Sequence, residues 1–270
     1  MIEAPASVVE DGVAAGRGRG ALIVNADDWG RDRETTDRIQ ECFAAEAISS
    51  ASAMVFMADS ERAAHIATQN KWDCGLHLNF TTAFSDTACP RRLVEHQQKV
   101  ARFLRWSRFN SILFHPGLAT SFTYLVQAQL DQFQRLYGVT PGRVDGHHHM
   151  HLCANVLTGR LIPPGAVVRR NFFFFPAEKS WINRSYRKFV DSRIAKRHRV
   201  VDYLFNLCPL VPLGRLQRII SLARHAIVEL EAHPVNPDEL QFLTGGGLLE
   251  LLGDLRVSPA FAGPPSHAHL

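Results

Sequence analysis

The sequence lacks the features that define membrane-spanning, secreted and repetitive proteins. None of its 270 residues falls in an unbroken apolar run of about 18, which excludes a hydrophobic transmembrane helix. The first twenty residues contain Glu3, Glu10 and Asp11 and no apolar core of a secretory signal, so we expect residues 1–20 to be a loose tail. No internal repeat or low-complexity block occurs, which argues against a solenoid.

Cysteine and net charge are also low. The five cysteines are odd in number and widely spaced, which predicts reduced thiols in a cytoplasmic protein and no disulfide framework. They are Cys42, Cys74, Cys89, Cys153 and Cys208. The formal net charge of +4 neither requires nor excludes a nucleic acid, and no nucleic-acid-binding motif accompanies it. We therefore expect no nucleic-acid partner.

Strand-like and helix-like segments alternate along the chain, which favours an α/β fold in one barrel-sized domain over residues 21–270. Apolar periodicity predicts helices over residues 33–47, 60–69 and 124–137. Ser60 is expected to cap the second helix, and Gly138 to end the third.

Four histidines fall within five positions in the sequence DGHHHMH at 145–151. In an extended segment Asp145, His147, His149 and His151 would line one side, and on a helix His147 and His151 would still share a face. Neutral imidazole is a common metal ligand, so the cluster predicts a metal site. The alternative is a polar loop, or histidines hydrogen-bonded within the core.

Two further segments place polar groups at the ends of predicted strands. Residues 21–26 form a short apolar run that ends in Asp27 and Asp28, although an Asx turn into the next helix would explain the pair as well. His77 lies between Leu76 and Leu78, where a lone histidine is more often a core residue. Together, Asp28, His77 and His147 can bind one metal ion with positions left for water and substrate, and Asp27 is free to take a proton.

Four ordered segments resemble the signature sequences of the YdjC-like carbohydrate deacetylases, a family that includes chito-oligosaccharide and hopanoid-biosynthesis-associated deacetylases. They are NADDWG at 25–30, GLHLN at 75–79, DGHHHMH at 145–151 and EAHP at 231–234. The resemblance runs from about residue 21 to about residue 247. Two positions depart from the family pattern: Trp29 replaces the usual Phe, and Val235 the usual Gly.

This resemblance implies a deformed (β/α) barrel of the glycoside hydrolase/deacetylase type and a hydrolase that removes an acetyl group from an N-acetylated sugar. It implies Asp28, His77 and His147 as metal ligands and Asp27 as general base. We assign His233 as the candidate general acid, since an imidazole can protonate the departing amine. The remaining candidates, Asp145, His149, His151 and Asn79, are expected to orient ligands or contact the sugar.

The cofactor is expected to be one divalent metal ion, with Mg or Zn as the first candidates, although Mn, Co and Ni also accept this ligand set. Two other functions remain open at this level. One is metal-dependent hydrolysis of another bond, as in a phosphoesterase, and the other is sugar binding without catalysis. The oligomeric state cannot be inferred from the sequence.

Two insertions, at about residues 84–120 and 171–199, combine aromatic and basic residues. The first holds Arg91, Arg92, Arg102, Arg105 and Arg108 with Phe103, Trp106 and Phe109. The second holds four consecutive phenylalanines at 172–175, then Trp181 and Tyr186 amid Arg184, Arg187, Lys188, Arg193, Lys196, Arg197 and Arg199. Such surfaces suit a sugar on a nucleotide or lipid carrier, or contact with a membrane. The simpler interpretation is a solvated basic helix beside a buried phenylalanine strand.

Overall fold

Seven parallel strands form one sheet in the computed structural model of the chain, which describes residues 20–175 and 178–258. The strands are β1 (Ala21–Trp29), β2 (Ser50–Ala53), β3 (Asp73–Leu78), β4 (Arg143–Gly146), β5 (Val167–Val168), β6 (Tyr203–Asn206) and β7 (Ile227–Ala232). Their order across the sheet is β5-β4-β3-β2-β1-β7-β6. The predicted tail, apart from residue 20, lies outside the described residues.

The burial of the central strand, β1, accounts for the apolar start of its sequence. β1 pairs with β2 on one side and with β7 on the other, and Leu22, Ile23 and Val24 are fully buried. A parallel strand covered on both faces has no solvent side, so the first part of β1, residues 21–24, is apolar and does not alternate with polar residues.

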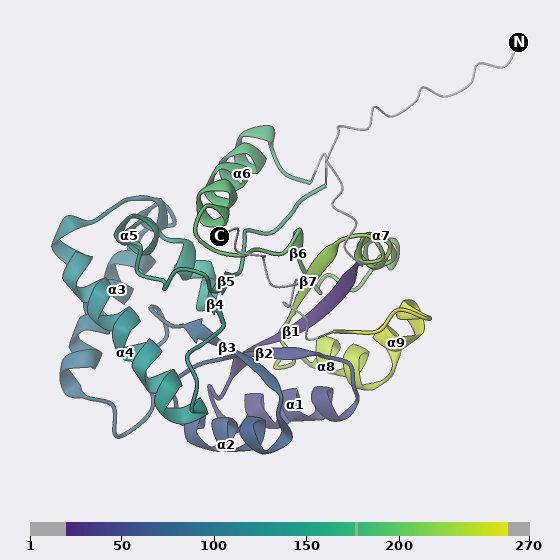
Figure 1. Cartoon of the computed structure of the whole chain (residues 1–270), viewed down its shortest axis with the longest axis horizontal. Coiled ribbons are helices and arrows are strands. Elements are labelled where there is room, and N and C mark those ends of the chain that lie inside the picture. Colours follow the sequence, from purple (N-terminus) through teal and green to yellow (C-terminus); the bar gives the residue numbers. More distant parts are fainter. Residues whose placement is uncertain (1–19, 176–177, 259–270) are drawn as a thin grey trace, which may run out of the picture.

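Helices surround the sheet (Figure 1). They are α1 (Arg33–Ala44), α2 (Ser60–Asn70), α3 (Arg91–Trp106), α4 (Ala119–Tyr137), α5 (Ala154–Gly159), α6 (Trp181–Ala195), α7 (Gly214–Ala223), α8 (Pro237–Thr244) and α9 (Gly247–Leu252). Three short 3-10 helices are η1 (Asn110–Ile112), η2 (Pro116–Leu118) and η3 (His147–Leu152). Among the described residues no helix is long and apolar enough to cross a bilayer.

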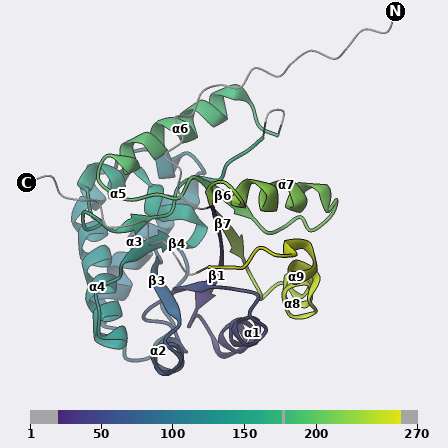
Figure 2. The same ribbon diagram turned by 45° about the vertical axis from the view of Figure 1, so that its right-hand side comes forward.

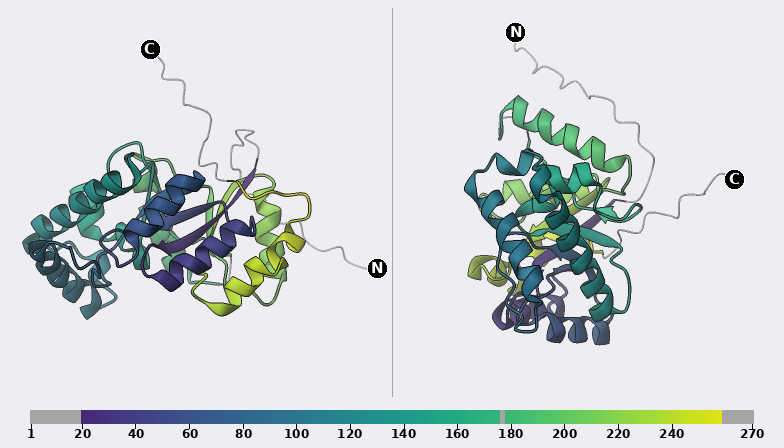
Figure 3. Two further views of the ribbon diagram at one scale, coloured as in Figure 1. Left: turned by 90° about the horizontal axis from the view of Figure 1, so that it is seen from below. Right: turned by 90° about the vertical axis from the view of Figure 1, so that its left-hand side faces the viewer.

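The sheet curls so that its two edge strands, β5 and β6, approach each other, and the strands lie inside the ring of helices (Figures 2 and 3). Backbone hydrogen bonds connect the two edges of the sheet. The backbone N–H of Phe173 donates to Leu204 O at 2.8 Å, and that of Val168 donates to Arg199 O at 2.9 Å. The predicted deformed barrel is therefore confirmed: one side is closed by irregular chain where a regular barrel would have a strand pair.

The predicted helices are present, with corrected ends. The first stops at Ala44 because the chain enters the left-handed region at Glu46, with φ 53°. The third begins earlier than predicted, at Ala119, and ends as expected before Gly138, which has φ 73°. Ser60 was wrongly assigned as a cap, since it is the first helical residue. Its hydroxyl donates to Met54 O at 2.9 Å and accepts from the N–H of Met57.

The first insertion is a helical hairpin. Phe103 of α3 packs edge-on against His115 at 4.9 Å between ring centroids, and His96 contacts the Ser121 hydroxyl of α4 at 2.9 Å. These pairings make α3 and α4 antiparallel. Trp106, at the turn of the hairpin, is 84% exposed.

The second insertion holds α6 and the phenylalanine segment, and the phenylalanines are not a strand. Residues 172–175 are partly buried and lie beside β6, but Phe173 makes their only backbone hydrogen bond to it among the described residues. One bond does not build a ladder, so the strand in the simpler interpretation was wrong.

Candidate metal centre and catalytic groups

Asp27 and Asp28 reach the same site because β1 is irregular at its end. The register between β1 and β2 shifts between Ala26 and Trp29, and Asp28 has φ 71°. Adjacent side chains of a regular strand point to opposite faces, so a bulge is required to turn both carboxylates toward one side. An aspartate tolerates this left-handed backbone better than most residues.

His77 is presented by β3 to the interior of the barrel. Its Nδ1 lies 2.7 Å from Asp145 Oδ1, and its Nε2 lies 3.4 Å from Asp28 Oδ1. Nε2 is buried and makes no hydrogen bond of ordinary geometry within the described chain. A buried imidazole nitrogen left in this way indicates a missing ligand, because buried polar atoms are otherwise paired.

The histidine run does not continue the strand. β4 ends at Gly146, and the chain then turns through η3 with His148 at φ 55° and His149 at φ 56°. The expected single face shared by Asp145, His147, His149 and His151 was therefore wrong, because left-handed residues reverse the side-chain direction within the run. Gly146 is required at the turn, since a Cβ there would lie 3.0 Å from Leu78 O.

The three predicted ligands nevertheless converge. His147 Nδ1 lies 2.9 Å from Asp28 Oδ1, and one ligand atom each from Asp28, His77 and His147 lies within 4.8 Å of the others. Two ligands of a tetrahedral ion bound at about 2.1 Å stand roughly 3.4 Å apart. The second oxygen of Asp28 is taken by Arg31 Nη1 at 2.8 Å, which leaves Oδ1 for the centre. This donor set fits a divalent cation.

The charges around the three candidate ligands also favour a bound cation. Burial alone raises the pKa of Asp28, but the imidazoles of His147 and His77 outweigh it and hold that pKa below its ordinary value. Burial alone lowers the pKa of His77, but Asp27, Asp145 and Asp28 around it raise the pKa to about 10. The cavity between these carboxylates therefore attracts positive charge, which either a proton or a metal ion can supply.

Asp145 contacts His77 on the Nδ1 side of its ring. Its Oδ2 accepts from Ser52 Oγ at 2.5 Å and from Arg143 Nη1 at 3.0 Å, while Oδ1 faces His77. Burial opposes ionisation of Asp145, but Arg169 and His77 lower its pKa well below the usual range. A fixed carboxylate on Nδ1 directs Nε2 of the same ring toward the centre.

Arg169 was missed by the sequence analysis and is the most connected side chain of the site. It is fully buried, and its two terminal nitrogens lie 2.6 and 2.7 Å from the two oxygens of Asp27. It also contacts Glu229 at 2.8 Å and Glu231 at 3.0 Å. Its position directly after β5 is the one signal that could have revealed it, because chemistry in a barrel gathers at the carboxyl ends of strands.

Asp27 is held at both oxygens beside the three predicted ligands. Arg169 grips both oxygens, and Asn25 Nδ2 donates to Oδ1 at 2.7 Å. Asp27 Oδ2 stands 3.8 Å from His77 Nε2, so the carboxylate borders the place where the three ligands meet.

Two histidines lie near Asp27 and contact Glu231. His149 Nε2 lies 3.0 Å from Glu231 Oε2, and His233 Nε2 lies 3.9 Å from Glu231 Oε1. Ligand-type atoms of Asp27, Glu231 and His233 also fall within 4.8 Å of one another. Burial opposes ionisation of Glu231, but His149 and Arg169 lower its pKa to about 2. The structure therefore brings His233 and His149 to the site.

Two other predicted residues, His151 and Asn79, contact the backbone near the site. His151 is fully buried and contacts the Arg169 backbone oxygen through Nε2 at 2.9 Å, and burial lowers its pKa to about 3. Asn79 donates to Thr82 O at 2.7 Å and accepts from the N–H of Thr82 at 2.9 Å. Asn79 thus holds the loop after β3, which supports the orienting role more than a sugar contact.

Comparison with known proteins places these residues in a family. The model of the YdjC-like protein family matches residues 21–240, which include every group described above. The chain belongs to the YdjC-like protein family. The matched range covers the carboxyl ends of all seven strands, so the site is built wholly from family sequence.

Individual YdjC-like relatives are similar over about half of the chain. A chitooligosaccharide deacetylase of Yersinia enterocolitica is 32% identical over 137 residues, which are 50% of this chain and 52% of the relative. A carbohydrate deacetylase of Mus musculus is 30% identical over 143 residues, which are 50% of this chain and 44% of the relative. The chain thus matches only about half the length of these curated relatives.

A solved structure from Enterococcus faecalis, provisionally named as a cellobiose-phosphate cleavage protein, has the same fold. It superimposes with a TM-score of 0.62 over 89% of this chain and 97% of its own, at 16% sequence identity. At that identity the likeness supports the curled parallel sheet and carries nothing about activity.

Proposed function

We propose that this protein is a metal-dependent hydrolase that removes the acetyl group from an N-acetylated sugar. The observation that carries the proposal is the convergence of Asp28, His77 and His147 beside a carboxylate, Asp27, that is clamped but outside the ligand set. The names of the YdjC-like relatives, which are chitooligosaccharide and carbohydrate deacetylases, support the choice of substrate.

The metal ion would be held by Asp28, His77 and His147. When bound, a divalent cation there polarises the acetamide carbonyl and lowers the pKa of water at the site. Zn suits the two imidazoles and one carboxylate, and Mg, Mn, Co and Ni are the alternatives to be separated by metal analysis.

The chain's own groups then supply the proton transfers. Asp27 takes a proton from the water whose oxygen bonds to the acetyl carbon, and Arg169 and Asn25 hold its oxygens in place for that task. His233 gives a proton to the sugar nitrogen as the carbon–nitrogen bond breaks. Acetate and the free amine leave, so one water is consumed for each amide bond cleaved.

The substrate is proposed to be an N-acetylated sugar on a nucleotide or lipid carrier. The support is the position of Phe172, whose ring lies 4.5 Å from that of His149 and which also lines a cationic and aromatic groove outside the barrel. A carrier could follow that groove while the sugar lies at the metal centre. Turnover of free chito-oligosaccharides equal to that of carrier-linked substrates would argue against this assignment.

The five cysteines support a reducing compartment such as the cytoplasm as the place of action. All five are free thiols, and burial raises the pKa of Cys42 and Cys74 to about 12. Such thiols are poor nucleophiles and suit a packing role.

The deciding experiment is an acetate-release assay across N-acetylated sugars with metal-depleted protein and after addition of each divalent cation. We expect acetate release that depends on one added metal. Release of phosphate from phosphorylated sugars without release of acetate would assign the site to a phosphoesterase, and sugar binding without turnover would assign it to a binding protein.

A further inference from the structure

Helix α6 carries an apolar stripe that nothing in the described chain covers. Ile182, Tyr186 and Phe189 are 63%, 44% and 57% exposed, and their spacing of four and three residues puts them on one helical face. The buried side of the helix holds Val190, Asp191 and Ile194. Trp181, at the start of the helix, is 70% exposed. A solvent-facing helix is normally polar on its outer side, so this stripe indicates a contact surface.

The same segment has a large surplus of positive charge. Residues 178–199 contain eight Lys and Arg against two Asp and Glu, a surplus of six, whereas the whole chain has a formal net charge of only +4. One of the two acids, Asp191, is occupied by Arg170 at 2.9 Å. The rest of the protein is therefore net negative, and the α6 side is strongly cationic.

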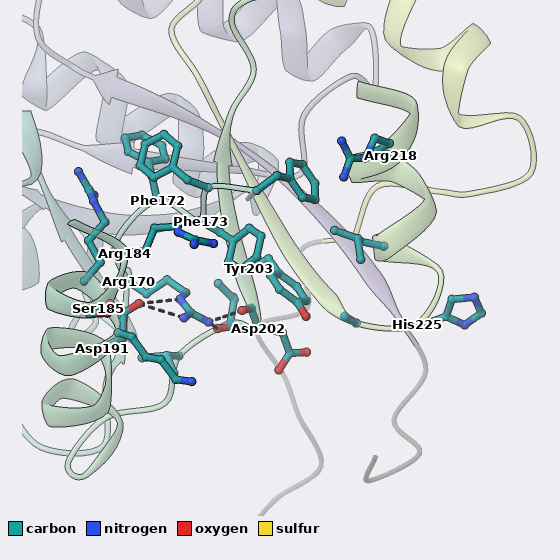
Figure 4. Close-up of a pocket in the computed structure, with 18 of the residues that line it drawn as sticks. Arg170, Phe172, Phe173, Arg184, Ser185, Asp191, Asp202, Tyr203, Arg218 and His225 are labelled. Carbon is teal, nitrogen blue, oxygen red and sulfur yellow. Dashed lines mark hydrogen bonds and ion pairs between the residues drawn. The ribbon is translucent and has the colours of Figure 1, made fainter. Parts of the chain in front are cut away.

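A groove of about 1160 Å³ runs beside α6, between that helix, β6 and α7 (Figure 4). Phe173 and Tyr203 line it, Arg184 stands on the α6 side, and Arg218 on the α7 side. Arg184 Nε is buried without a hydrogen-bond partner in the described parts of the chain, and the Arg218 guanidinium lies 3.9 Å from the centroid of the Phe175 ring. The groove thus continues the cationic and aromatic character of the helix.

The acids of the groove offset its positive charge only in part, since five Lys and Arg line it against two aspartates. Asp191 is held by Arg170, and the carboxylate of Asp202 accepts the N–H of Ile227 at 2.8 Å. Arg184 and Lys188 form no ion pair within the described residues, so their charges face the groove and solvent. An anionic group is what this rim would recognise.

We propose that α6 docks on an anionic lipid surface. The apolar stripe would lie at the boundary between headgroups and acyl chains, and the cations of the helix and the groove rim would contact lipid phosphates. A nucleic acid would use the cations but leave Ile182 and Phe189 in water. A second copy of the chain would bring two like-charged surfaces together, which costs energy.

The docked orientation has a consequence for the candidate site. Phe172 lines the groove and packs on His149, so the lipid-facing groove borders the catalytic groups. Docking itself does not depend on which bond the site hydrolyses.

The test is co-sedimentation of the full chain with vesicles of phosphatidylcholine alone and of phosphatidylcholine mixed with phosphatidylglycerol. We expect binding to the mixed vesicles only, weakened by added salt. Equal binding to both kinds of vesicle, or binding to neither, would overturn the proposal.

Two matched double variants test whether vesicle binding depends on the cations of α6 or on the positive charge of the protein in general. Lys188→Gln with Arg193→Gln removes two exposed cations of α6 and should weaken binding about 30-fold, since each cation near an anionic surface contributes about fivefold. Arg33→Gln with Arg135→Gln removes two exposed cations from α1 and α4, which lie away from α6 (Figure 1), and should change binding little. Equal loss in the two double variants would overturn the assignment to α6.

A further double variant tests the apolar stripe. Trp181→Ser with Phe189→Ser should abolish vesicle binding while the melting temperature and the acetate release from a soluble substrate stay unchanged, because both side chains are exposed. If the wild-type protein releases no acetate, that result counts against the proposed function and not against docking. A dimer that these two changes convert to a monomer, without vesicle binding by the wild type, would assign the stripe to a second copy.

Discussion

Arg169 holds Asp27 by both oxygens, with Nη1 2.6 Å from Oδ2 and Nη2 2.7 Å from Oδ1. The same guanidinium touches Glu229 and Glu231, so one buried cation ties the end of β1 to β7. Burial disfavours the charge of Arg169, but Asp145, Asp27 and the glutamates raise its pKa well above the ordinary value. The proposed base is thus fixed by a group that is always charged.

The first prediction concerns this clamp. Arg169→Lys keeps the charge but cannot grip both oxygens of Asp27, so kcat for acetate release should fall about 100-fold with metal content unchanged. The melting temperature should also fall, since a lysine leaves some of the buried carboxylates without a partner. Arg170→Lys, one position along and paired with Asp191 in the groove, is the control and should keep kcat near wild type. An unchanged kcat in Arg169→Lys would remove the clamp from the mechanism.

The second prediction separates the base from the ligands. Asp27→Asn should retain bound metal and lose about 10² to 10⁴ in kcat, because proton transfer is lost while Asp28, His77 and His147 remain. His147→Ala should lower metal affinity and lose activity that excess metal partly restores. Metal content by plasma spectrometry and acetate release together check both variants. Loss of metal in Asp27→Asn would make that carboxylate a ligand.

The third prediction tests the proton donor. His233→Ala should lower acetate release from an N-acetylated sugar about 10² to 10³-fold, since the departing amine needs a proton. Hydrolysis of p-nitrophenyl acetate should change much less, because its leaving group departs without one. His149→Ala is the comparison, as His149 also contacts Glu231. If only His149→Ala shows the selective loss, the donor is His149.

The fourth prediction concerns pH and the metal-free protein. The pKa of His77 is raised to about 10, so its protonation stabilises the folded state in full below its unfolded pKa of about 6.5, and this stabilisation is lost as pH rises toward 10. The free energy of unfolding of metal-free protein should therefore fall between pH 7 and 8.5, by at most about 1.4 kcal/mol per pH unit for one proton.

Cys42 and Cys74 add to this fall at the upper end of the window, because burial raises their folded pKa to about 12 while unfolded thiols ionise near a pKa of about 8.5. The slope near pH 7 is therefore the one that reports His77. Metal-loaded protein should show a weaker slope, since the ion replaces the proton on His77. Urea unfolding at each pH measures the slope, and His65→Gln, a change at an exposed histidine on α2, should leave it unchanged. A flat or rising stability in metal-free protein would contradict the charge assigned to His77.

The sequence by itself determined the class of fold and indicated the candidate ligand set. Strand-like runs ending in Asp28, His77 and the start of the histidine run were visible because parallel strands are apolar and their carboxyl ends meet at one edge of the sheet. Family resemblance added the barrel and the proposed substrate class. The motifs are local in sequence, so their residue types and order reveal them.

Tertiary structure decided what depends on distant contacts. The backbone angle of Asp28, the left-handed turn at His148 and His149, and the grip of Arg169 on Asp27 arise from pairings between β1, β4, β5 and β7 that no local pattern encodes. In the sequence, Arg169 is simply one arginine within a basic region. Only folding surrounds it with four carboxylates, because charge compensation in a buried site is a property of residues up to 142 positions apart.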